Sequence, residues 1–81
     1  MINWYKYGKY FNEKINDGDI ITFVKENNDP VKIEVISKQM SDFKVTYRGK
    51  SIITNFALQD FYKKNCIEIK VNDQNITSEV S

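Results

Sequence analysis

The sequence contains no histidine, a single cysteine and only three glycines. Histidine is the usual general acid or base near neutral pH, so its absence removes the commonest route to catalysis. Cys66 has no histidine to activate it and no second thiol with which to hold zinc. The glycines, Gly8, Gly18 and Gly49, lie too far apart for a phosphate-binding loop. We therefore predict a non-enzymatic protein without a metal, another cofactor or a small-molecule substrate.

Long apolar runs are also absent. Runs such as Ile20–Ile21 are only two or three residues long, whereas a membrane-spanning helix requires about 20 apolar residues. The first residues, Met1–Lys6, lack the basic segment and apolar stretch of a secretory signal. We expect a cytoplasmic protein that does not contact a membrane, and a lone cysteine agrees with a reducing compartment.

No charge of one sign dominates, since 12 basic residues balance 11 acidic ones. The resulting net charge of +1 does not draw the whole chain toward nucleic acid, so electrostatic recognition has to come from local patches. Arg48 is the only arginine and Ala57 the only alanine, a bias that an AT-rich genome produces. This bias suggests a low-GC bacterium, one of its phages or a mobile element.

The composition is that of a small folded protein, because 41% of the 81 residues are hydrophobic. We expect one domain over residues 1–71. Residues 72–81 are polar, and we expect them to form a mobile C-terminal tail.

Two periods compete in the aromatic N-terminal segment. The alternation of Tyr5 and Tyr7 before Gly8 fits a short strand that ends in a turn. We favour a helix, because helical spacing of large apolar residues continues through the whole segment. These residues are Trp4, Tyr7, Phe11 and Ile15.

The remaining sequence predicts antiparallel strands joined by short turns. Asp17-Gly18 is the strongest turn signal, because glycine readily adopts positive φ. Stretches of β-branched and aromatic residues follow, several of them alternating with polar residues, and Arg48-Gly49-Lys50 indicates a tight hairpin. The expected strands cover residues 20–25, 31–35, 43–47, 51–54 and 67–71.

A short helix is expected before the last strand. Thr54 or Asn55 can cap it, and a stripe of apolar residues would face the sheet, formed by Ala57, Leu58, Phe61 and Tyr62. The elements together predict a mainly β (α+β) fold with a possible N-terminal helix. Its sheet would be a small antiparallel sheet packed on helices or a partly open SH3-like barrel of four or five strands.

Aromatic rings near the N-terminus and the lone arginine at a hairpin tip favour a protein-binding function. Rings and guanidinium groups most often anchor protein interfaces, although rings also fill the core of a small domain. We predict an accessory protein of a phage or mobile element that docks on a host or self protein and inhibits or bridges it, for example in host defence. The predicted contact residues are Trp4, Tyr5, Tyr7, Tyr10 and Arg48.

Two alternatives remain open. A small nucleic-acid-binding β-barrel would place cations on phosphates and the N-terminal rings on bases, although lysines also protect edge strands from aggregation. A structural subunit of a virion or another assembly would instead associate through its sheet edges. The cations of the nucleic-acid hypothesis are Lys44, Arg48, Lys50, Lys63 and Lys64.

Overall fold

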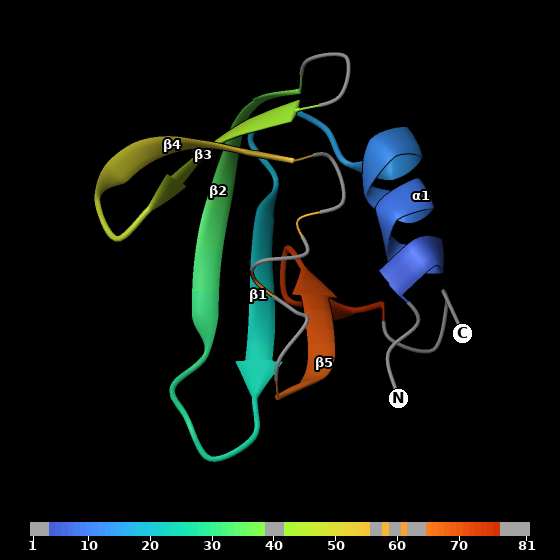
Figure 1. Cartoon of the computed structure of the whole chain (residues 1–81), viewed down its shortest axis with the longest axis vertical. Helices are drawn as coiled ribbons and strands as arrows, with labels where there is room; N and C mark the ends of the chain where they lie inside the picture. The colour runs from blue at the N-terminus through green and yellow to red at the C-terminus, as the bar shows by residue number, and fades with distance from the viewer. Residues whose placement is uncertain (1–3, 39–41, 56–57, 59–60, 62–64, 77–81) are drawn as a thin grey trace.

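A computed structural model of the chain describes residues 4–38, 42–55, 58, 61 and 65–76. The elements within these residues are α1 (Trp4–Lys14), β1 (Ile20–Lys25), β2 (Val31–Lys38), β3 (Asp42–Tyr47), β4 (Lys50–Asn55), β5 (Cys66–Val71) and β6 (Gln74–Asn75). All six strands belong to one open antiparallel sheet in the order β4-β3-β2-β1-β5-β6 (Figure 1). The predicted mainly β fold with an N-terminal helix is confirmed, with six strands in place of four or five.

The sheet consists of a four-stranded meander, β1 to β4, after which the chain crosses back to add β5 beside β1. Strands β1 to β4 each pair with the next strand along the chain, and β5 then pairs with the free side of β1. This order leaves β1 inside the sheet and places β4 and β6 at its two ends. The sheet curls, and α1 stands against one side of it (Figure 1).

The core lies between α1 and the face of the sheet that we call the inner face. Phe11 of α1 contacts Phe23 of β1 edge-on, with ring centroids 6.4 Å apart. Phe11 and Ile15, the two members of the predicted helical spacing whose side chains are described, are both fully buried. Alternate strand residues complete the inner face, among them Ile21, Ile33, Val35, Phe43, Val45 and Ile69.

A hydrogen-bonded turn connects α1 to the sheet. The Asp19 N–H donates to the Asn16 carbonyl at 3.1 Å, and Gly18 within the turn has a φ of 91°. The Asp19 carboxylate accepts the Asn16 N–H at 2.9 Å and the Asn72 side-chain amide at 3.1 Å. Asn72 in turn accepts the Ile20 N–H at 2.9 Å through its side-chain oxygen. The turn before β1 is thereby joined to the turn after β5.

Two β-bulges interrupt the pairing. The register of β2 on β3 shifts at Ile36, and the register of β5 on β1 shifts at Ile67. A bulge adds one residue to one strand and bends it. The second bulge places Cys66 opposite Lys25.

The helix expected before the last strand lies largely outside the described residues, and so do Ala57 and Tyr62 of its stripe. Leu58 and Phe61 are buried in the core, as expected of that stripe. Leu58, however, has a φ of 55°, so a right-handed helix does not pass through it.

The boundary expected between domain and tail lies too early. Asn72 and Asp73, both with positive φ, reverse the chain into β6, which pairs with β5. Ile76 is only 2% exposed and its N–H donates to the Ile69 carbonyl at 2.9 Å. The folded part therefore extends at least to Ile76, and residues 77–81 lie outside the described residues.

Candidate docking surface at the hairpin turns

Three segments of the chain meet at one end of the sheet. Because β1 and β3 are both antiparallel to β2, the β1–β2 turn and the β3–β4 turn lie at the same end, where β5 also begins. Two adjoining depressions of about 360 and 370 Å³ lie between these segments. We call them together the turn hollow. Residues from all three segments line it, including Lys25, Val31, Tyr47, Arg48, Thr54 and Phe61.

Aromatic rings form one wall of the turn hollow. Tyr47 meets Phe61 edge-on at a centroid distance of 5.5 Å, and Phe61 stacks on the core residue Phe23 at 5.6 Å. Phe61 is only 8% exposed, so this wall continues directly into the core. The rings are therefore held in place before any partner binds.

Arg48 stands at the rim of the turn hollow. Arg48 and Gly49 have φ values of 52° and 77°, the two successive positive angles of a type I′ hairpin turn. The exposed guanidinium lies over the Tyr47 ring at 5.2 Å, and within the described residues it forms no salt bridge with a carboxylate. A guanidinium held against a ring and without an acid partner is well placed to receive an acceptor from another molecule.

Hydrogen bonds fix the opposite side of the turn hollow. The Lys25 ammonium group donates to the Phe61 carbonyl. The Glu26 N–H donates to the Asn65 carbonyl at 2.7 Å. Both bonds tie the end of β1 to the segment before β5, so the walls are connected to the sheet.

Thr54 contributes a buried polar group to the turn hollow. The residue is 8% exposed, and its hydroxyl oxygen has no hydrogen-bond partner among the described residues. Leaving a buried hydroxyl unsatisfied costs about 1–3 kcal/mol. Because Thr54 lines the turn hollow, a bound group could satisfy it.

The structure divides the predicted partner-binding residues between two places. Arg48 lines the turn hollow. Tyr10 is half-buried on α1, where its ring lies 6.1 Å from that of Phe11 and packs against the core. The other three belong to the backbone of α1, and their side chains lie outside the described residues: Trp4, Tyr5 and Tyr7.

The three described cations of the nucleic-acid hypothesis do not share one face. Lys44 pairs with Ile53 and points to the outer face, opposite the core, whereas Lys50 pairs with Tyr47 and belongs to the inner-face register. Arg48 lies in the turn between them. Lys63 and Lys64 lie outside the described residues.

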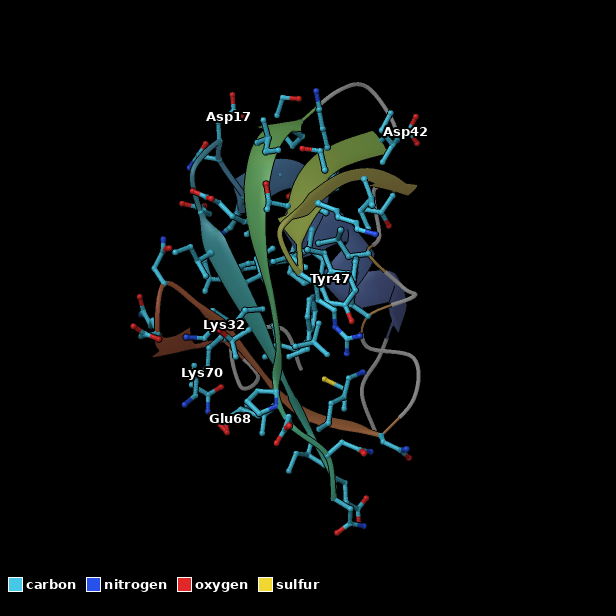
Figure 2. All side chains as sticks on the ribbon, turned by 90° about the vertical axis from the view of Figure 1, so that its left-hand side faces the viewer. Asp17, Lys32, Asp42, Tyr47, Glu68 and Lys70 are labelled. Carbon is cyan, nitrogen blue, oxygen red and sulfur yellow. The ribbon has the colours of Figure 1, made fainter. Side chains whose placement is uncertain are left out.

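The outer face carries both basic and acidic side chains. Lys32 and Lys70 flank Thr22 in the pairing register, and Lys70 lies 4.0 Å from Glu68. Figure 2 shows Lys32, Lys70 and Glu68 gathered on the same part of the sheet, set apart from Tyr47. This surface has the mixed charge of a solvated sheet face.

Sequence reasoning missed most of the turn hollow. The sequence pattern predicts a strand position for Tyr47 and a helix stripe position for Phe61, and it marks Lys25 only as the last residue of a strand. The sequence could have indicated Tyr47, because this residue directly precedes Arg48 at the predicted hairpin tip. The position of Phe61 depends on long-range packing, which no local pattern reveals.

Cys66 is half-buried beside this region. Burial raises the pKa of the Cys66 thiol, and this effect outweighs a backbone hydrogen bond at Glu68 and the charge of Lys25, which lower it. A thiol with a raised pKa is a poor nucleophile.

Comparisons with models of protein families, with curated proteins and with solved structures give no match. Within the described residues, no helix has the length and apolar character needed to cross a membrane. The same residues contain no cluster of three or more histidine, cysteine, aspartate or glutamate side chains suited to a metal ion.

Proposed function

We propose that this chain is a protein-binding module that docks on another protein through the turn hollow, with Arg48 and Tyr47 as its anchors. The observation that carries this proposal is the Arg48 guanidinium, exposed over the Tyr47 ring without a carboxylate partner among the described residues. Arginine and tyrosine are enriched among the residues that dominate binding energy at protein interfaces.

Two further features support docking. The aromatic wall offers apolar surface that is already fixed by the core, so a partner would not need to order it on binding. The buried Thr54 hydroxyl offers a hydrogen bond. A matching partner surface would present an apolar side chain, with a carboxylate or carbonyl oxygen within reach of Arg48.

The sequence also suggests a biological setting for this docking. Small size, near-neutral charge and the AT-rich residue bias favour an accessory protein of a phage or mobile element that inhibits or bridges a host protein, for example one of a defence system, in the cytoplasm. The N-terminal rings Trp4, Tyr5 and Tyr7 stay a predicted second contact region.

Affinity capture from a low-GC bacterial lysate, with and without nuclease, tests the proposal. We expect the tagged chain to retain a specific protein after nuclease treatment. The Arg48→Asn variant should capture at least about tenfold less of that protein. Asparagine before glycine is favoured in a type I′ turn, so Arg48→Asn removes the guanidinium and preserves the hairpin. Lys32→Asn, a change of the same kind on the exposed outer face, is the matched control and should behave as the unaltered chain.

Two results would contradict the proposal. Equal capture by Arg48→Asn and the unaltered chain would exclude Arg48 as an anchor. A broad set of captured proteins that disappears with nuclease would exclude protein docking and favour the nucleic-acid hypothesis, for which binding should also weaken steeply with salt.

A further inference from the structure

The outer edge of β4 carries unpaired backbone groups. Because the Arg48–Gly49 turn has two residues, Tyr47 and Lys50 form the closing hydrogen-bonded pair of the hairpin. Hydrogen-bonded and non-bonded pairs alternate along an antiparallel ladder. The N–H and C=O groups of Ser51 and Ile53 therefore point away from β3, and no described residue pairs with them.

This edge lacks the features that usually prevent strands from pairing. Natural edge strands are shortened, or carry lysine or proline. The opposite edge of the sheet, β6, has only two residues. In contrast, β4 has six residues, and none of its positions from Ser51 to Asn55 is charged or proline.

The edge also exposes a large apolar side chain. Ile53 is 71% exposed, the highest value among the exposed large hydrophobic residues that the structure describes. It points to the outer face beside Lys44. An uncharged edge with an exposed isoleucine at its centre suits another apolar strand better than solvent.

We propose that β4 pairs with β4 of a second copy of this chain, in antiparallel register about a two-fold axis at Ile53. This register places Ile53 opposite Ile53 and Ser51 opposite Asn55, so that the outward backbone groups of both strands bond to each other. No like charges face each other along the paired segment, and the net charge of +1 opposes association only weakly. A second copy fits because this edge segment is complementary to itself.

The paired strands would also border the turn hollow. Ile52, Ile53 and Thr54 all line the turn hollow, and in this register Ile52 of one copy lies opposite Thr54 of the other. The second copy would therefore lie beside the hollow of the first.

Sedimentation equilibrium over a wide range of protein concentration tests this inference. We expect the unaltered chain to form a dimer, and Ile53→Lys to weaken dimer formation by about tenfold or more, because two lysines would face each other. Ile67→Lys is the matched control, since Ile67 is 56% exposed but lies in the β5 bulge. Its dimer should have unchanged affinity. Far-UV circular dichroism verifies that each variant is folded.

A cross-linking experiment tests the register without weakening the edge. In a Cys66→Ser background, Ile53→Cys should give a covalent dimer on mild oxidation, because Cα atoms of a bonded antiparallel pair lie about 5.5 Å apart, within disulfide range. Ile67→Cys in the same background should stay monomeric on gels. A monomeric unaltered chain at every concentration, equal loss of dimer in both lysine variants, or no Ile53→Cys cross-link would overturn the inference.

Discussion

At the residue scale, the residues with positive φ can be compared with the residue types that this backbone conformation favours. Most non-glycine residues with positive φ are short and polar, as this region requires: Asn27, Asn65, Asn72 and Asp73. The two exceptions are Leu58 and Arg48. Leu58 is buried in the core, so packing explains its presence. Arg48 is exposed in a type I′ turn that favours asparagine before Gly49, and this supports Arg48 as an anchor.

The thiol of Cys66 gives a prediction about pH. Because burial raises its pKa in the folded chain, the rate of alkylation by iodoacetamide should rise with pH at a higher midpoint in the folded chain than in the urea-unfolded chain. Below that midpoint the folded chain should react several-fold more slowly. Mass spectrometry of the alkylated fraction measures both profiles.

The raised pKa of Cys66 also determines how the stability of the fold changes with pH. A folded-state pKa above the unfolded value means that the thiol contributes stability below the unfolded pKa, and this contribution is lost as pH rises through the folded pKa. Equal midpoints in folded and unfolded chains, or a lower one in the folded chain, would show that burial does not control this thiol.

At the element scale, sequence patterns predicted the elements more successfully than their exact pairing. The helix α1 and the strands β1 to β5 arise from local periodicity, which the sequence displays directly. The bulges at Ile36 and Ile67 depend on how neighbouring strands fit together, and isoleucine is an ordinary strand residue at both places. The strand β6 was missed because its two residues are polar and its pairing depends on the Asn72–Asp73 turn.

The candidate site was predictable only at its tip. The hairpin and Arg48 follow from Arg48-Gly49 in the sequence, whereas Thr54 and Phe61 join the site through the curl of the sheet and long-range packing. The local sequence at the end of a strand does not predict which distant segment that strand end will contact.

The Asp19 cluster gives a prediction about how elements are joined. Asp19→Ala removes acceptors for the Asn16 N–H and the Asn72 amide, so we expect the free energy of unfolding to fall by about 2 kcal/mol. Asp17→Ala is the matched control, because within the described part of the chain the Asp17 carboxylate accepts one bond, from the Lys38 N–H at 3.2 Å. Urea titration followed by circular dichroism measures both variants. A smaller loss for Asp19→Ala than for Asp17→Ala would contradict the central role of this cluster.

At the scale of the whole molecule, the strand order predicts a gradient of amide protection. β1 and β2 are the two middle strands and each is bonded on both sides, whereas β4 and β6 form the ends of the sheet. Amide hydrogen exchange at low protein concentration should therefore be slowest in β1 and β2 and fastest in β6 and at the outward amides of Ser51 and Ile53. Nuclear magnetic resonance measures each amide separately. Slower exchange in β4 than in β1 and β2 would mean that protection does not follow the strand order.

The pairing of β1 with β5 also determines how the fold would respond to mechanical pulling. The N-terminal end of β1 lies beside the C-terminal end of β5, where Ile21 and Val71 are register partners. A force that draws the preceding and following chain apart would therefore load this ladder at one end and open its hydrogen bonds in succession. Strands peeled in this way resist far less than strands whose bonds must all break together by sliding. A sheet centred on a strand this well protected from solvent would thus yield readily to a machine that unfolds proteins by pulling on the chain.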